Sequence, residues 1–123
     1  MTVKLGGLVA TEYHDQTDIK VSDFVDGRFT LGLWLDPGFR VDLVQIRNAA
    51  NMPGAAVMVG DGSEAARFGS AVVSGDVWQD MATPGAGRIV LERFHPVVRV
   101  DDVDEEAARF GSFDLRFYGY RVD

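Results

Sequence analysis

Cysteine is absent from the 123-residue chain, which excludes disulfides, thiol nucleophiles, thiolate metal sites and iron–sulfur clusters. Lysine is scarce as well, because only Lys4 and Lys20 are found among the twelve basic residues. Nineteen acidic residues bring the net charge to −7, so the chain lacks the positive charge that neutralises nucleic-acid phosphates. We therefore expect no nucleic-acid partner.

Long apolar runs are lacking too. The longest early stretch, Leu5 to Ala10, is shorter than the apolar segment of about 7–15 residues in a secretory signal peptide. Nothing approaches the roughly 18 consecutive apolar residues of a membrane-spanning helix. We expect no export signal and no membrane insertion, with a location in the cytoplasm or in a virus particle. The length predicts a single domain over residues 1–123.

Short apolar or alternating runs between Gly, Pro, Asp and Asn recur along the whole chain, and fourteen glycines accompany them. Helical periodicity is hard to find, so the pattern predicts an all-β sandwich or barrel. In the expected strand 39–47, alternation does not separate a buried face from a solvated one. The expected strands are 29–35, 39–47, 55–59, 71–73, 77–78, 88–94 and 113–118. Trp34 lies within the first of these strands, so we expect it in the core.

The string EAARFGS occurs twice, at residues 64–70 and 106–112. The residues around the two copies do not match, so a tandem-repeat architecture is not indicated. Glu, Ala, Ala and Arg favour a helical turn that the following Gly ends, with the Phe packed beneath it. A pair of equivalent strand lead-ins and a partner-binding motif are the alternatives.

The segment from Phe24 to Asn48, FVDGRFTLGLWLDPGFRVDLVQIRN, resembles the opening of discoidin-like (galactose-binding-like) domains. The later strings GRIVL (residues 87–91) and FDLRFYG (residues 113–119) resemble the closing strands of the same family. The resemblance implies an antiparallel jelly-roll β-sandwich of about eight strands. It also implies that loops at one end of the sandwich bind sugars, lipid headgroups or proteins, without catalytic machinery.

Among these domains, the F-type lectins bind fucose through a His on an early loop and two Arg on a later loop. His14 lies in a polar early segment, but the string after Ile46, RNAANMPG, lacks the second Arg of those lectins. Aromatic side chains such as Tyr13 can stack on sugar rings, and His and Arg can donate hydrogen bonds to hydroxyls. The expected glycan-binding residues are therefore Tyr13, His14, Asp15, Arg47, Asn48 and Asn51.

The F-type lectins also hold a structural calcium ion. Asp26 and Asp114 match positions that bind the ion in those lectins, so the resemblance implies calcium at these two residues. Calcium needs roughly six to eight oxygen ligands. From the residues alone, Arg28 could instead satisfy Asp26 as an ion pair without any metal.

Motifs for catalysis are missing from the sequence. The two histidines, His14 and His95, are far apart, no serine lies in a G-x-S-x-G setting, and no glycine-rich string carries the lysine of a phosphate-binding loop. We expect a non-catalytic binding module, and a glycosidase is the remaining enzymatic alternative. The other hypothesis is a structural component of a phage virion, such as a decoration, tail or adsorption protein. A glycan or a protein is then the partner, and the chain is a homo-oligomer or part of a larger assembly.

Overall fold

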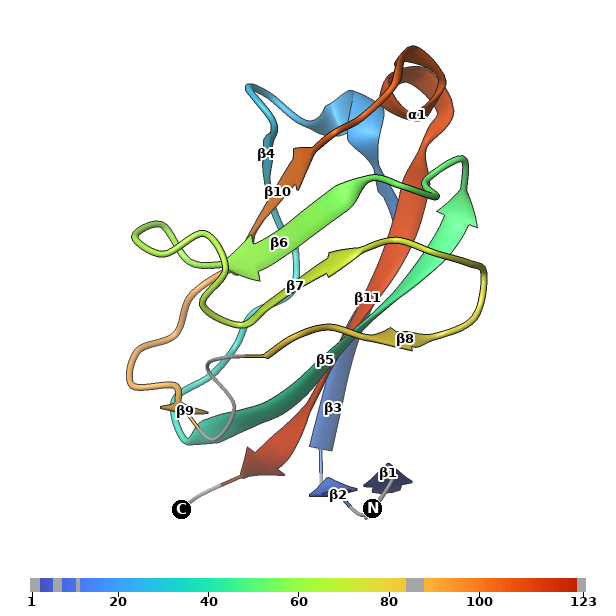
Figure 1. Cartoon of the computed structure of the whole chain (residues 1–123). Coiled ribbons are helices and arrows are strands. Elements are labelled where there is room, and N and C mark those ends of the chain that lie inside the picture. Colours follow the sequence, from blue (N-terminus) through green and yellow to red (C-terminus); the bar gives the residue numbers. More distant parts are fainter. Residues whose placement is uncertain (1–2, 6–7, 11, 84–87, 122–123) are drawn as a thin grey trace.

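The computed structural model describes residues 3–5, 8–10, 12–83 and 88–121, which form two antiparallel sheets packed face to face (Figure 1). Three short elements complete it: the 3-10 helix η1 (Val21–Asp23), the helix α1 (Glu105–Phe110) and a separate pair of strands, β1 (Val3–Leu5) and β2 (Leu8–Ala10). The larger sheet has the order β3 (Glu12–Lys20), β11 (Ser112–Arg121), β5 (Phe39–Ala50) and β8 (Gln79–Asp80), and β9 (Arg88–Ile89) also pairs with β5. The smaller sheet has the order β4 (Arg28–Thr30), β10 (Val97–Asp101), β6 (Ala56–Gly60) and β7 (Gly69–Val72).

The chain crosses between the sheets at almost every connection. Of the eight strands named in the two sheet orders, β6 and β7 are the pair that follow each other in the chain and also lie side by side in the described structure. This is the double Greek-key order of a jelly roll, so the expected all-β jelly-roll sandwich is confirmed. Among the described residues, no helix combines the length and apolar composition needed to cross a bilayer.

The core lies between the two sheets and is filled by alternate residues of the long strands. Burying each of its large side chains stabilises the fold by about 1.5–3 kcal/mol. The fully buried side chains include Phe39, Val41, Val44 and Ile46 of β5, Phe113, Leu115 and Phe117 of β11, Val57 and Val59 of β6, and Val98 of β10.

A bulge explains why alternation in β5 is ambiguous. Tyr118 pairs with Leu43 but the next residue, Gly119, pairs with Val41, so Asp42 is an extra residue on β5. The side chains of Val41 and Val44 therefore both face the core although they are three positions apart. Gly119 allows this close approach, because a Cβ at that position would lie 2.7 Å from the Phe39 ring.

The expected strand 29–35 is shorter in the structure, because β4 ends at Thr30. The backbone N–H groups of Gly32 and Leu33 donate to Oε1 of Gln16, at 2.8 and 3.1 Å, instead of pairing with a strand. The backbone pairs again at Leu35 with Phe94, and the side chains of Leu31 and Leu35 are buried, whereas Trp34 between them is 41 % exposed. The expectation that Trp34 lies in the core is wrong.

The two copies of EAARFGS adopt different structures. The second copy forms α1, which begins after Asp104, whose side chain accepts a hydrogen bond from the N–H of Ala107 at 2.7 Å. The first copy forms only a turn before β7, and its Phe68 is buried whereas Phe110 of the second copy is 65 % exposed. The expected helical turn is confirmed for the second copy and wrong for the first, and the packed Phe is found only in the first.

Candidate functional site

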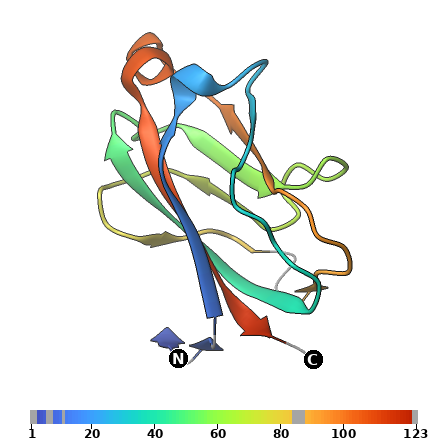
Figure 2. The ribbon, with the colours of Figure 1, turned by 180° about the vertical axis from the view of Figure 1, so that it is seen from behind.

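The outer face of the larger sheet carries a continuous group of aromatic and arginine side chains. Side chains that alternate with the buried ones point away from the core, and Figure 2 shows their strands from the side opposite to Figure 1. The register places Tyr13 beside Tyr118, and Asp15 beside Arg116. We call this surface the sheet face and define it by Tyr13 and Asp15 of β3, Arg40, Asp42, Gln45 and Arg47 of β5, Trp78 and Asp80, and Asp114, Arg116, Tyr118 and Tyr120 of β11.

Trp78, which precedes the edge strand β8, lies at the centre of these contacts. The guanidinium carbon of Arg116 lies 4.2 Å from the centroid of its ring, and that of Arg47 lies 4.6 Å away. Arg116 also lies 5.5 Å from the ring of Tyr13, which in turn packs against Tyr118 with the ring centroids 6.0 Å apart. Guanidinium and aromatic planes within about 6 Å attract each other, so these five side chains form one connected platform.

Each arginine of the sheet face has a carboxylate partner. Arg47 donates to Oδ2 of Asp114 at 2.8 and 3.0 Å, and Arg40 donates to both oxygens of Asp42 at 2.9 and 3.0 Å. The hydrogen bonds and charge of Asp42 raise the pKa of Arg40. Arg116 lies 3.6 Å from Asp15. The sheet face is therefore close to electrically neutral within a chain of net charge −7.

Arg116 also has an incomplete set of hydrogen bonds. Its Nη1 donates to the hydroxyl of Tyr118 at 3.3 Å, while its Nε is buried and has no hydrogen-bond partner among the described residues. Burial lowers the pKa of Arg116, but the hydrogen bond and charges of its neighbours outweigh burial and raise it. The side chain thus remains a cation with part of its donor capacity unused.

The structure brings together only part of the expected glycan site. Tyr13, Asp15 and Arg47 all belong to the sheet face. They lie on strands, so the expectation that they form a loop at one end of the sandwich is wrong. Alternation explains the error for β3, because it turns His14 to the opposite side from its two neighbours.

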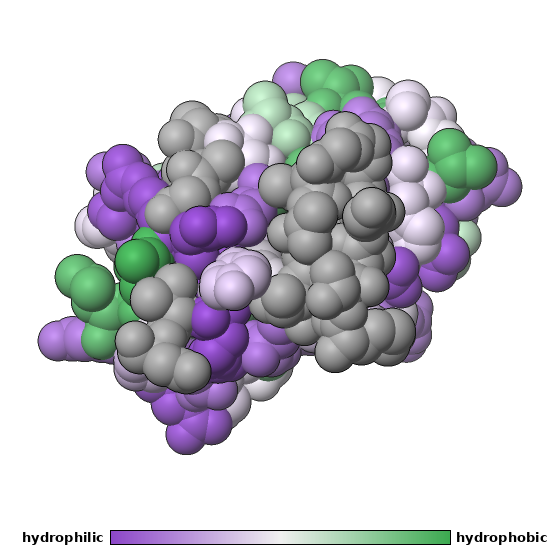
Figure 3. All heavy atoms as spheres, turned by 90° about the horizontal axis from the view of Figure 1, so that it is seen from below, coloured by the Kyte–Doolittle hydropathy of each residue, from purple (hydrophilic) through white to green (hydrophobic). Residues whose placement is uncertain are grey.

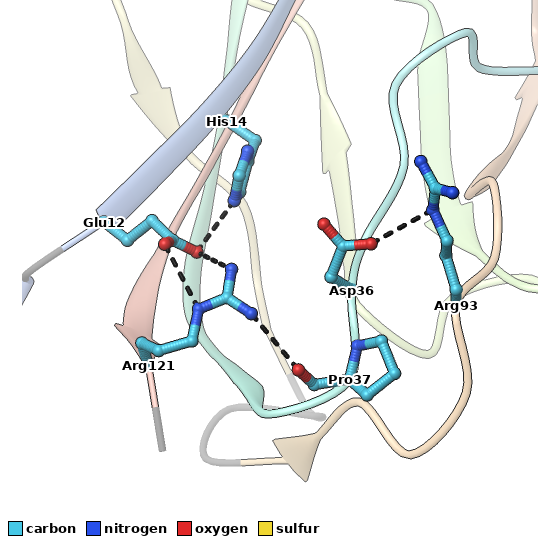
Figure 4. Close-up of polar contacts among 6 residues, drawn as sticks. All are labelled: Glu12, His14, Asp36, Pro37, Arg93 and Arg121. Carbon is cyan, nitrogen blue, oxygen red and sulfur yellow. Dashed lines mark hydrogen bonds and ion pairs between the residues drawn. The ribbon is translucent and has the colours of Figure 1, made fainter. Parts of the chain in front are cut away.

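His14 takes part in a polar cluster at the end of the sandwich where β3 begins (Figure 4). Its Nε2 lies 2.9 Å from Glu12, and its ring meets that of Phe39 edge-on, with centroids 5.0 Å apart. Glu12 also accepts from Arg121 at 2.6 Å, and Arg121 donates to the carbonyl of Pro37. Partial burial raises the pKa of Glu12, but its hydrogen bonds to Arg121 and His14 outweigh burial and lower it. These contacts tie β3, β11 and the turn before β5 together.

Asn48 and Asn51 lie away from the platform, at the end of β5. Oδ1 of Asn48 accepts from the N–H of Met52 at 3.0 Å, and the side chain of Asn51 donates to the carbonyl of Phe110 at 3.5 Å. Both amides therefore hold the connection between β5 and β6 in place. This gives them a structural role that their positions in the sequence do not reveal.

The expected calcium residues do not form a shared site. Asp114 is buried on β11, and its carboxylate accepts from Arg47 and from the N–H of Asp18 at 2.8 Å. Asp26 is exposed in the turn before β4, on the other sheet, where the carbonyl of Gly27 accepts from the N–H of Val100. In the described ranges no three His, Asp or Glu side chains gather as a cation requires. The residues present do not fit the implied calcium ion.

Sequence reasoning missed Arg116 and did not select Trp78. The signal for Arg116 was available, because Asp114, Arg116 and Tyr118 alternate with the buried residues of an evidently half-buried strand. Trp78 was harder to find, since its position depends on the pairing of β8 with Gln45 and Ile46, far away in the sequence. Comparisons with family models, curated proteins and solved structures found no match.

Proposed function

We propose that the protein is a non-catalytic module that binds a neutral glycan on its sheet face. The observation that carries the proposal is the platform of Tyr13, Tyr118, Trp78, Arg47 and Arg116 on a single surface. Aromatic rings stack on the apolar faces of sugars, and a few well-placed polar groups orient a ligand. The proposed glycan site therefore lies on the strands of the larger sheet and not on the end loops.

The charge pairing of the sheet face supports a neutral ligand. Because Asp15, Asp42 and Asp114 each neighbour an arginine, an acidic sugar would have to compete with a carboxylate that is already in place. The same pairing supports binding rather than hydrolysis. A glycosidase needs one carboxyl group that donates a proton and a second that acts as a base or nucleophile, whereas these carboxylates serve as partners of guanidinium groups.

A glycan array followed by calorimetry tests the proposal, with Trp78→Ala as the site variant. Trp34→Ala is the control for loss of a tryptophan, because Trp34 is more exposed than Trp78 but lies near His95 and Arg93, outside the sheet face. We expect the wild-type protein and Trp34→Ala to bind neutral oligosaccharides with the same affinity. Trp78→Ala should bind them at least about ten-fold more weakly, because a lost stacking contact of about 1.4 kcal/mol corresponds to a ten-fold change in affinity. Absence of binding to any glycan, or equal loss in both variants, would refute it.

A protein-binding surface within an assembly, such as a phage particle, is the second candidate. One observation favours it: Trp, Tyr and Arg are the residue types that dominate the binding energy of protein interfaces, and all three meet on the sheet face. Light scattering distinguishes the two functions. Self-association that Trp78→Ala abolishes, together with an unresponsive glycan array, would support the assembly role, whereas a monomeric protein that binds glycans would contradict it.

A further inference from the structure

A second site lies at the end of the sandwich opposite α1, where residues 88–95 meet the connection between β6 and β7 (Figure 1). These segments enclose an open cavity of about 530 Å³, within the range of roughly 300–1,000 Å³ that is typical of small-molecule sites. Figure 3 looks onto this end. It shows hydrophobic atoms beside strongly hydrophilic ones at its left margin, the side on which Figure 1 places β9.

The wall of the cavity is apolar and partly aromatic. Phe68 and Val90 are buried in it, and the ring of Phe94 stacks on that of Phe68 with centroids 5.8 Å apart and planes 24° apart. Leu91 and Ile89 lie at the rim, where they are 84 % and 45 % exposed. The cavity can therefore remove an apolar ring from water.

Three guanidinium groups line the same cavity. Nε of Arg93 forms an ion pair with Asp36 at 3.1 Å, as Figure 4 shows, and Arg67 forms ion pairs with Asp61 at 2.7 Å and with Glu64 at 3.3 Å. Arg88 is exposed, and its guanidinium has no hydrogen-bond or ion-pair partner among the residues that the structure describes. Each guanidinium offers about five N–H donors, so most of this donor capacity is unused.

The carboxylate of Asp61, the more buried of the two in the cavity lining, already has hydrogen-bond donors. Oδ1 of Asp61 accepts from the N–H of Ser63 and of Glu64, both at 2.8 Å, and from the Ser63 hydroxyl, while Oδ2 faces Arg67. Burial raises the pKa of Asp61, but these hydrogen bonds outweigh burial and lower it, so the carboxylate stays charged and occupied. Glu92, at the exposed rim, is the other carboxylate in the lining. The lining thus holds three guanidinium groups and two carboxylates beside an apolar wall, and Asp36 and Glu64 outside the lining pair with Arg93 and Arg67.

We propose that this cavity binds a small organic anion that carries an apolar ring, of the aromatic carboxylate class. The ring lies against Phe68 and Phe94, and the carboxylate accepts hydrogen bonds from Arg88 and Arg93. Charge-assisted hydrogen bonds of this kind are about twice as strong as neutral ones. The site is distinct from the sheet face, so the two proposals stand or fall separately.

Phenylacetate and phenylacetamide are the probes, because they share one shape and differ in charge. Backbone amide signals of the wild-type protein are followed by NMR while each probe is added to millimolar concentration. We expect phenylacetate to shift the signals of Phe68, Val90 and Phe94, and phenylacetamide to bind clearly more weakly. Equal binding of the two probes, or no shift at these residues, would overturn the proposal.

Two substitutions test the role of the arginines. Arg88→Gln should weaken phenylacetate binding by about three- to ten-fold, as the loss of one partly solvated charged hydrogen bond predicts. Arg109→Gln removes the same charge from the exposed surface of α1, at the other end of the molecule, and should leave binding unchanged. Equal weakening by both variants would mean that net charge alone attracts the probe, and the assigned site would be wrong.

Discussion

Phe68→Ala and Phe110→Ala are the same substitution in the same seven-residue string, and the structure predicts different outcomes. Phe68 is 4 % exposed, its ring stacks on Phe94, and its N–H donates to the carbonyl of Val59. Phe110 is 65 % exposed at the end of α1. Because the residues beside the two Phe side chains are identical, a large difference in stability between the two variants reports their structural environment and not the local sequence.

The expected magnitudes differ several-fold. Replacing a buried Phe by Ala costs about 3–5 kcal/mol from lost burial and the cavity left behind. For a chain of this length, 1 kcal/mol corresponds to roughly 3–6 °C, so Phe68→Ala should lower Tm by about 10–30 °C. An exposed substitution usually stays within about 0.5 kcal/mol, so Phe110→Ala should shift Tm by no more than about 3 °C.

Urea unfolding followed by circular dichroism measures both variants. The slope of unfolding free energy against denaturant should match that of wild type in each case, so that midpoints compare directly. The double variant serves as a control, because the two sites share no contact and their effects should add. Equal destabilisation by the two single variants would refute the assignment of Phe68 to the core.

Two further predictions concern the bulge and the end cluster. Gly119→Ala should cost about 3 kcal/mol or more, because the new methyl group would overlap the backbone carbonyl oxygen of Arg40 and the Phe39 ring. Gly62→Ala, where nothing lies within 4 Å, should be nearly neutral, and similar unfolding midpoints for the two variants would contradict this. The lowered pKa of Glu12 means that its contribution to stability is present above the ordinary value of 4.5 and is lost as pH falls through the folded value. Glu12→Gln should therefore destabilise the protein near neutral pH and much less at about pH 3, and urea midpoints that differ from wild type by the same amount at both pH values would contradict it.

The sequence predicted the strands whose pattern is local. Alternation in β11 identified its buried Phe113, Leu115 and Phe117, and the strand occupies Ser112–Arg121. The two faces of β5 could not be assigned, because the extra residue Asp42 is defined only by its partner strand. Periodicity describes a strand by itself, whereas a bulge belongs to a pair of strands.

The candidate site was harder to predict for a related reason. Tyr13 and Arg47 were selected as loop residues, yet they meet Trp78 only because β3, β11, β5 and β8 lie side by side. The side chain of Gln16 likewise accepts hydrogen bonds from the backbone N–H groups of Gly32 and Leu33, far along the chain. Side-chain contacts between distant segments leave no local pattern to detect.

The pairing of β3 with β11 also determines how the molecule would respond to mechanical force. Glu12, where β3 begins, lies opposite Gly119, near the end of β11. Tension applied through these two points acts along the inter-strand hydrogen bonds, because such bonds run perpendicular to antiparallel strands. The inter-strand hydrogen bonds would then break one after another, and they would not share the load at the same time. Pulling through tethers attached near both points would therefore separate β3 from β11 at a low force.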